Sequence, residues 1–349
     1  MKATRLFKCF FAAALLLSAF SLQPSALRAQ GNLTPPGAPA PVMKTLDQIE
    51  ARTPISAAPF TISAPGSYYL TTNVTTTVSN AIVITASGVT LDLNGFTLAS
   101  TMANAANGGT AILLGSGLSD LTILNGHIRS GVTNNGSGVF SGSGFANGIV
   151  YSGTAPVNTR ISGISAAGCL SYGIYLNYSY STVVESCAVR TIGSSGIFAP
   201  TIKSCLALDC GGSAILGDQV SDSRGASTGS GDGLSGSTAQ NCYGSSSSGV
   251  GVVATIAQNC YGSSGSYYGL YASTAQNCYG SSSTGTGLSA TRTANNCYGS
   301  STTGTGLYAY NASFCTGQRS GGTAIQATIA TGCIASSGTN NITYKYNMP

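Results

Sequence analysis

The sequence has very few charged residues. Only 7 % of its 349 residues are Asp, Glu, Lys or Arg, and it contains a single histidine and no tryptophan. Because an ordinary globular domain carries about 25 % charged residues, this surface is not that of a typical α/β enzyme. The 14 basic residues form no basic stripe, which is the minimum that nucleic-acid binding requires. We therefore expect no nucleic-acid partner.

Long apolar runs are missing beyond the first thirty residues. The single run, CFFAAALLLSAF at residues 9–20, follows three basic residues and precedes a segment of small residues. It is too short to span a membrane, and its flanks are typical of a secretory signal peptide (residues 1–29) cleaved near Ala29. Cleavage would leave ten basic residues against nine acidic ones, a net charge of about +1. We predict a secreted protein, extracellular or periplasmic, with no membrane span.

What the sequence has in abundance is a repeat. The phrase AQNCYGSS surrounds Cys242, Cys260 and Cys278, and NNCYGSS surrounds Cys297. A fixed period with period-two alternation inside each unit is typical of a parallel β-solenoid, whose coils stack about 4.8 Å apart. Ile164 precedes the repeating column in a longer coil. The members of the column are 18 or 19 residues apart: Cys187, Cys205, Ser223, Cys242, Cys260, Cys278, Cys297, Cys315 and Cys333.

Two further columns are predicted to face the core. One is aliphatic and precedes each new cysteine position by eight or nine residues: Ile197, Ile215, Leu234, Val252, Leu270, Leu288, Leu307 and Ile325. The other is glycine, two residues after the cysteine: Gly244, Gly262, Gly280, Gly299 and Gly317. Six residues after the cysteines stand Ser and Thr, whereas a left-handed hexapeptide solenoid needs an aliphatic residue there. The hexapeptide acyltransferase fold is therefore excluded.

The order of these phrases, with GVTLDLNGFTL (88–98) and LTILNGHIRS (121–130), resembles the right-handed parallel β-helix superfamily typified by pectate lyases. The entry segment, residues 40–71, looks like the start of a group of secreted bacterial β-helix proteins of unassigned function. The resemblance implies an all-β, single-stranded right-handed parallel β-helix of about a dozen coils over residues 59–349, regular from about 187 to 349. Before it, residues 30–58 are predicted to form a Pro/Gly linker and, near 43–51, a short capping helix.

The polar residues beside the cysteines are predicted to be structural. Asn241, Asn259, Asn277 and Asn296 form a column whose side-chain amides can hydrogen-bond from coil to coil. The ten cysteines left after cleavage lie in an oxidising compartment, but the coil spacing of about 4.8 Å exceeds the Cβ separation of about 3.8 Å that a disulfide prefers. We expect buried free thiols. No CxxC pair is present, so no zinc site is expected.

Tyr243, Tyr261, Tyr279 and Tyr298 follow the cysteines and are predicted to point outward as a ladder. Aromatic faces flanked by Ser hydroxyls and Asn amides suit sugar stacking, which makes these four residues the candidate ligand site for a polysaccharide or cell-surface glycan. The alternative is purely structural: neighbouring rings pack on each other for about 0.2–1 kcal/mol per pair. Both readings remain open at this stage.

Catalytic candidates are few. Enzymes of the superfamily that the sequence resembles use clustered Asp residues with a basic residue or calcium, and the nearest match here is Glu185, Lys203, Asp222 and Arg224. Glu185 and Lys203 are predicted to occupy one column on adjacent coils. Such a group could remove a proton from a uronate or bind a cation, and it could equally be an exposed series of ion pairs. The single histidine, His127, is expected to be a solvated surface residue in the tyrosine column.

These observations favour a non-catalytic protein, a secreted or envelope-associated scaffold or adhesin-like module that binds polysaccharide along the tyrosine ladder. No cofactor is expected, with calcium as the one alternative. The competing hypothesis is a polysaccharide lyase or glycoside hydrolase acting on uronic-acid polymers.

Overall fold

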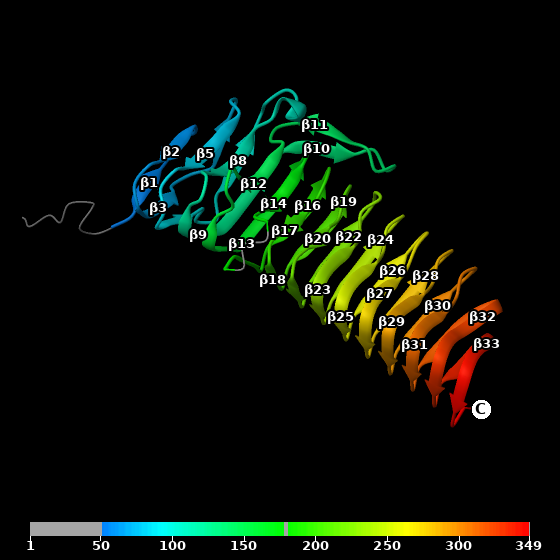
Figure 1. Cartoon of the computed structure of the whole chain (residues 1–349). Coiled ribbons are helices and arrows are strands. Elements are labelled where there is room, and N and C mark those ends of the chain that lie inside the picture. The colour runs from blue at the N-terminus through cyan, green and yellow to red at the C-terminus, as the bar shows by residue number, and fades with distance from the viewer. Residues whose placement is uncertain (1–50, 178–180, 349) are drawn as a thin grey trace, which may run out of the picture. The chain divides into compact units, whose positions relative to one another are not determined.

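The chain forms a parallel β-helix of about 15 turns (Figure 1). Residues 51–177 and 181–348 are described by a computed structural model, and the one helical element in these ranges is a single 3₁₀ turn, η1 (Ala105–Asn107). The predicted all-β fold is confirmed. The signal peptide, the linker up to residue 50 and nearly all of the expected capping helix lie outside the described residues.

The first strand lies earlier than predicted. Strand β1 (Thr53–Ile55) pairs in parallel with β3 (Gly66–Leu70), so Ile55 is already part of the core, whereas residues up to 58 were assigned to the linker and capping helix. In the segment PISAAPFTIS apolar and polar residues alternate only weakly around two prolines, so the sequence pattern does not indicate this strand.

Each coil contributes strands to three sheet faces, here called A, B and C. Face A is built from β2 (Phe60–Ile62), β5 (Asn80–Ile84), β8 (Thr110–Leu114), β12 (Asn147–Tyr151), β14 (Tyr172–Tyr175), β17 (Ile197–Phe198) and β20 (Ile215–Leu216). It continues in the first halves of β23 (Leu234–Gln240), β25 (Val252–Gln258), β27 (Leu270–Gln276), β29 (Leu288–Asn295) and β31 (Leu307–Ser313). Each face A strand of the regular coils begins with an aliphatic residue that points into the core. Because side chains alternate along a strand, this residue occupies the same position in every coil.

Face B follows face A along each coil, and face C follows face B. Face B contains β1, β3, β6 (Val89–Asp92), the first parts of β9 (Ser119–Arg129) and β13 (Val157–Cys169), β15 (Val183–Glu185), β18 (Thr201–Lys203), β21 (Gln219–Ser221) and the second halves of β23 to β31. Face C contains β4 (Val74–Thr76), β7 (Thr97–Ser100), the ends of β9 and β13, β16 (Ala188–Ile192), β19 (Leu206–Cys210), β22 (Arg224–Ser227), β24 (Tyr243–Ser246), β26 (Tyr261–Ser264), β28 (Tyr279–Ser282), β30 (Tyr298–Ser301) and the starts of β32 (Thr316–Thr331) and β33 (Ile334–Tyr346).

The strand register confirms the predicted columns. The aliphatic residues from Ile197 to Ile325 pair directly with one another on face A, and all are fully buried. The glycine column from Gly244 to Gly317 pairs in the same way on face C. The repeat in the sequence is therefore the coil of the fold, and in-register stacking places equal residues on top of each other.

The core becomes narrower along the chain. On face B the inward residue changes from Leu91, Ile123 and Ile161 through Val220 to alanine from Ala239 onward. On face C the inward column runs Leu98, Ile128, Ala166, Val189, Ala207, Gly225 and then glycine in every coil to Gly317. Face A keeps its aliphatic residue throughout, so faces B and C approach it as their side chains shrink.

The glycines of the regular coils are required by this narrowing. A Cβ atom placed on Gly262 would collide with the carbonyl oxygen of Gly269 across the coil, and Gly244 and Gly280 meet equivalent carbonyls. Backbone therefore packs against backbone at this side of the core, where no side chain fits.

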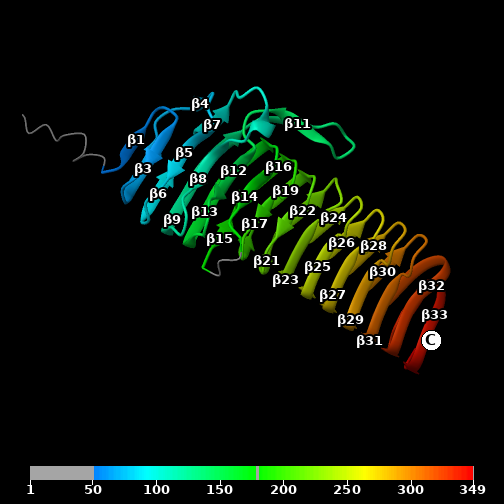
Figure 2. The ribbon, with the colours of Figure 1, turned by 45° about the horizontal axis from the view of Figure 1, so that its top comes forward.

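A hairpin interrupts the coil pattern in the first half of the chain. Strands β10 (Gly131–Asn134) and β11 (Phe140–Ser143) pair antiparallel to each other and project beyond the stacked coils (Figure 2). The Asn134 amide donates to Asp209 Oδ1 at 2.6 Å and to Thr228 Oγ1 at 3.2 Å. The hairpin thus connects its own coil to two coils that follow much later in the sequence.

Candidate functional site

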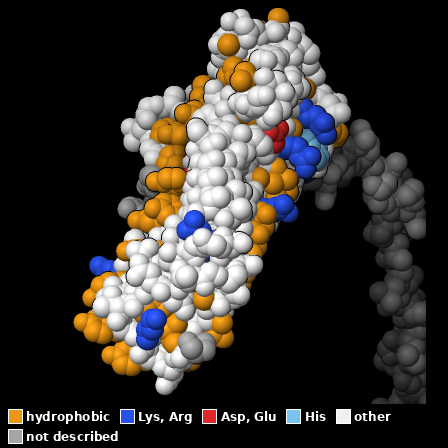
Figure 3. Space-filling model, turned by 90° about the vertical axis from the view of Figure 1, so that its right-hand side faces the viewer, with side chains coloured by type: hydrophobic (Ala, Val, Ile, Leu, Met, Phe, Trp, Pro, Cys, Tyr) orange, Lys and Arg blue, Asp and Glu red, His pale blue; other side chains and the backbone are white. Residues whose placement is uncertain are grey.

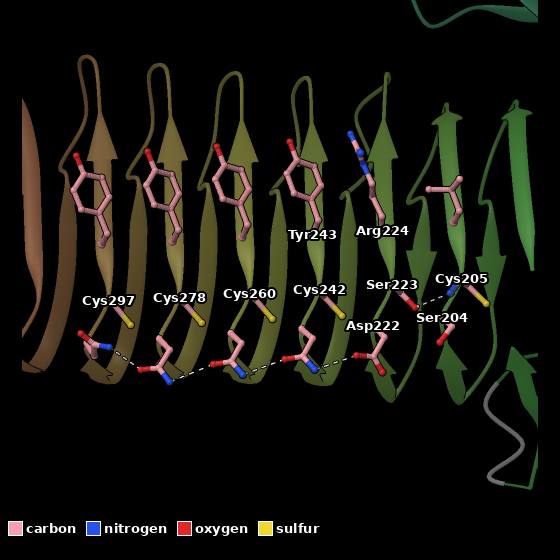
Figure 4. A pocket seen from close by; sticks show the side chains of 18 of the residues that line it. Ser204, Cys205, Asp222, Ser223, Arg224, Cys242, Tyr243, Cys260, Cys278 and Cys297 are labelled. Atoms are coloured by element: carbon pink, nitrogen blue, oxygen red, sulfur yellow. Dashed lines mark hydrogen bonds between the residues drawn. The ribbon is translucent and has the colours of Figure 1, made fainter. Parts of the chain in front are cut away.

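A long groove runs along the corner between faces B and C. It has a volume of about 1020 Å³ and is open to solvent. Asparagines line one side, tyrosines line the other, and the cysteines between them form its floor (Figure 4). We call this surface the Tyr–Asn groove. Its lining comes from seven successive coils, from Ser204 to Thr316.

The corner itself is made by left-handed residues. Asn241, Asn259, Asn277 and Asn296 all have φ between 50° and 54°, a conformation that Asn tolerates better than other residues with a side chain. Their amides form the predicted asparagine ladder: each Nδ2 donates to the Oδ1 of the preceding coil at 2.9–3.2 Å. The ladder begins at Asp222, whose Oδ1 accepts from Asn241 at 3.0 Å.

The tyrosine ladder is a continuous stack. The rings of Tyr243, Tyr261, Tyr279 and Tyr298 have centroid separations of 4.9, 4.7 and 4.8 Å and interplanar angles of 10° or less. Arg224 places its guanidinium 4.6 Å from the Tyr243 ring centroid at one end, and the Tyr298 hydroxyl donates to Gln318 at the other. The ring faces therefore contact one another, and the ladder presents its ring edges and hydroxyls to the groove.

The phenol groups of Tyr261 and Tyr279 are hydrogen-bond donors at neutral pH. Partial burial, followed by the neighbouring phenols, raises the pKa of Tyr261 and of Tyr279 above the usual value for tyrosine. The hydroxyls of Tyr261 and Tyr279 are thus protonated, and the ladder places one hydroxyl in each coil opposite a line of side-chain amides.

The four charged candidates lie at different places and have different partners. The register confirms that Glu185 and Lys203 are directly paired on β15 and β18, but Glu185 forms its ion pair with Arg160 of the preceding coil. Asp222 starts the asparagine ladder, and Arg224 covers the end of the tyrosine ladder. Only Asp222 and Arg224 line the groove. A catalytic role for the four residues stays a prediction.

His127 occupies the position that the sequence indicated. It pairs with Thr97 and Ser165 on face C, and the same column continues through Leu206 and Arg224 to Tyr243. His127 is exposed, and the two coils of Ser165 and Ala188 separate it from the groove.

One aromatic group was missed by the sequence analysis. Tyr268 contacts Tyr267 and Tyr271 at centroid separations of 4.7 and 5.2 Å, and the Tyr271 and Tyr308 side chains point outward from face A with 36 % and 40 % of their surface exposed. The segment SYYGLYAS (266–273) carries the signal, because inward Leu270 places its neighbour Tyr271 outside. Unlike the ladder rings, these rings are not in a continuous stack.

The cysteines are buried and free. All ten cysteines of the described residues lack a disulfide, and those of the groove floor are at most 3 % exposed. Burial raises the pKa of Cys169 and of Cys210 to about 12. Buried thiols are thus confirmed, and desolvation keeps Cys169 and Cys210 protonated.

Neither a multidentate metal site nor a membrane helix is found in the part of the chain that the structure describes. Residues 51–177 and 181–348 contain no group of three or more His, Cys, Asp or Glu side chains placed around a common point. In the same ranges there is no helix with the length and apolar character that crossing a bilayer requires.

Comparison with known proteins gives a distant structural likeness. No family model matches the chain, and no curated protein matches it. Among solved structures, the Dettilon tailspike protein (gp208) matches 84 % of this chain and 60 % of its own chain, with 12 % identity and a TM-score of 0.28. The chain therefore spans less than two thirds of that tailspike. Assignment of the parallel β-helix rests on the strand pairing described above.

Proposed function

We propose that this protein is a secreted scaffold of the cell envelope or extracellular space that binds polysaccharide in the Tyr–Asn groove and does not catalyse a reaction. The observation that carries the proposal is the pair of parallel ladders. Tyrosine hydroxyls and asparagine amides repeat at one coil spacing on opposite sides of an open groove. A chain of repeating sugar units offers hydroxyls at regular intervals, and these can donate to and accept from such groups.

The stacked rings define how the ligand would be held. Because the ring faces are covered by neighbouring rings, sugars would contact ring edges, phenol hydroxyls and amides instead of stacking on the rings. Charge contributes little, since charged side chains are sparse on the surface seen in Figure 3. Binding should therefore depend only weakly on salt concentration.

The polysaccharide lyase or hydrolase remains the rival function, and the positions of the charged residues support it less. Asp222 and Arg224 both interact with the ladders, and Glu185 is paired with Arg160. A general base needs a free carboxylate directed at a substrate site. The neutral groove favours binding.

A panel of immobilised neutral and uronic-acid polysaccharides tests the proposal, with absorbance of unsaturated uronate as the readout for lyase activity. We expect retention on at least one polymer and no product. Simultaneous Tyr→Phe changes at residues 243, 261, 279 and 298 retain the stack and remove the hydroxyls, so affinity should fall at least tenfold, about 1.4 kcal/mol.

The exposed tyrosines of face A supply the matched control. Simultaneous Tyr→Ser changes at Tyr267, Tyr271 and Tyr308 should leave affinity unchanged, because these residues lie outside the groove. Three outcomes would each contradict the groove as the binding site: unchanged affinity of the quadruple Tyr→Phe variant, loss of affinity in the face A variant, or absence of binding to every polymer. Product formation that disappears in Asp222→Asn would establish the rival enzyme.

Export is tested separately. We propose cleavage after Ala29, and N-terminal sequencing of the protein recovered outside the cytoplasm should begin at Gln30. An uncleaved N-terminus would contradict the assignment of the signal peptide.

A further inference from the structure

The two ends of the tyrosine ladder differ. At the first end the Arg224 guanidinium lies 4.6 Å from the Tyr243 ring centroid, so a cation covers a ring face that no other ring covers (Figure 4). At the last end Tyr298 pairs with Thr316, whose side chain is too small to cover a ring. No aromatic ring or cation of residues 51–177 and 181–348 lies over that outer face of Tyr298. The ladder therefore ends in one open ring face.

The asparagine ladder stops on the same coil. Asn296 Nδ2 donates to Asn277 Oδ1 at 2.9 Å, but in the described part of the chain no amide of the next coil donates to Asn296 Oδ1. The next residue at this corner is Phe314, which has a φ of 53° and is 66 % exposed. Bulky residues are uncommon at positive φ, and backbone strain of this kind is found where ligands bind. An exposed aromatic ring thus follows the last amide.

Both ladders end in one place. Four residues line the last part of the Tyr–Asn groove, here called the end subsite: Asn296, Tyr298, Phe314 and Thr316. The Tyr298 and Phe314 rings make no contact with each other in the described ranges, so space remains between them. The Asn296 carbonyl and the Thr316 hydroxyl can accept hydrogen bonds there. Among the described residues that line the groove, the one Lys or Arg is Arg224, at the opposite end.

Open ring faces and neutral acceptor oxygens are the groups that recognise an organic cation. The face of an aromatic ring attracts an ammonium group, and the oxygens accept its N–H hydrogen bonds. We propose that the end subsite binds an ammonium group of the ligand, in the position that the Arg224 guanidinium takes at the first end. This inference rests on the proposed function, and it gives the ligand a chemical class, a polysaccharide of amino sugars whose amino groups are not acylated.

The end subsite distinguishes this class from other sugars. An N-acetylated sugar carries an uncharged amide, so it gains no attraction between a cation and the Tyr298 ring. An acidic sugar would direct negative charge at a ring face and at acceptor oxygens, which is unfavourable. Since the subsite contains no charged side chain of the protein, binding should still depend only weakly on salt concentration.

The test is isothermal titration calorimetry of the folded protein with two oligosaccharides of equal length and linkage, a glucosamine oligomer and an N-acetylglucosamine oligomer. We expect the glucosamine oligomer to bind about tenfold more tightly while its amines are protonated. This preference should disappear at a pH at which the amines are neutral.

Variants of Thr316 test the open ring face. Thr316→Arg would place a guanidinium over Tyr298, as Arg224 does over Tyr243, so the ratio of the two affinities should fall to about one. Thr316→Ser is the matched control, because it keeps a small hydroxyl side chain and should keep the ratio. Tyr271→Ser on face A lies outside the groove and should leave both affinities unchanged.

Variants of Phe314 test the other ring. Phe314→Ala should lower the ratio about threefold, and Phe314→Tyr should retain it. Equal affinities of the two oligomers for the unchanged protein, or an unaltered ratio in Thr316→Arg, would overturn the end subsite and leave the groove in place as a glycan site. Absence of binding by both oligomers would also overturn it, while the polysaccharide panel decides whether the groove binds glycans at all.

Discussion

The coils before residue 187 and those after it enclose their cores in different ways. In the first region large aliphatic side chains fill the coil from all three faces, as Leu91, Leu98 and Ile112 do. In the second region Val189, Ile202 and Val220 mark a transition, and from Ala239 onward face A alone supplies a large side chain while alanine and glycine line faces B and C. The first arrangement tolerates insertions such as the β10–β11 hairpin, and the second imposes a nearly constant coil of 18 or 19 residues.

The difference shows that the regular coils repeat their sequence because their core is narrow. When backbone packs on backbone across the coil, no side chain can adjust to a change in length or shape. Each regular coil is then constrained to resemble its neighbours, and ladders of identical side chains form on its outer surface. In the wider coils the outward residues vary, and no ladder of comparable length forms.

The largest loss of stability is expected from substitutions in the aliphatic column of face A, which both regions share. Leu270→Asp would bury an unpaired carboxylate between coils and should cost at least about 4 kcal/mol of unfolding free energy. Ile112→Asp in the wide region should cost as much, because Ile112 is also fully buried. Urea unfolding followed by circular dichroism measures both. Tyr261→Ser on the outer face is the control, and an equal loss there would mean that the faces are reversed.

A somewhat smaller effect tests the narrowing itself. Gly262 and Val189 belong to the same inward column of face C. Gly262→Val would place a valine side chain at position 262, where it would collide with the Gly269 carbonyl. We expect a loss of about 3 kcal/mol by overpacking. The reverse change, Val189→Gly, leaves a cavity and should cost about 2 kcal/mol. Thermal unfolding of the two variants provides the comparison, and a neutral Gly262→Val would show that the regular coils have spare room.

The smallest effect concerns the boundary of the asparagine ladder. Asp222→Ala removes the acceptor of the Asn241 amide, and because both groups are exposed the loss should be about 0.5 kcal/mol. Asp222→Asn keeps an acceptor in place and should restore most of it. Chemical denaturation under identical conditions resolves the pair, and equal stabilities of the Ala and Asn variants would mean that the ladder gains nothing from its first acceptor.

The regular region could be predicted from the sequence almost residue by residue. Each of its columns repeats one kind of residue with few exceptions, and an in-register parallel solenoid permits one register for them. The pairing of Leu270 with Leu288 and of Tyr261 with Tyr279 confirms that register. The wide region was harder, because Thr53–Ile55 lacks a clear alternation and the β10–β11 hairpin belongs to no repeat.

The details of the site depended on side-chain geometry. That the tyrosines formed a ladder followed from the spacing, but that their faces were covered by one another did not, because a ring can also lie flat against the sheet. The partners of Asp222 and Arg224 were hidden for a similar reason: both residues are polar and exposed, and nothing in the pattern indicates that each ends a different ladder.

The asparagine ladder also has an electrical direction. Every amide donates toward the start of the chain, so the side-chain dipoles are aligned head to tail along the axis of the β-helix. Their positive end faces the carboxylate of Asp222, and their negative end, the Asn296 carbonyl, faces the coil that carries Phe314 at the same corner. The arrangement is the side-chain counterpart of a helix macrodipole, in which a negative group is favourable at one terminus and a positive group at the other. Each additional coil with Asn at this corner would lengthen the dipole in the same sense.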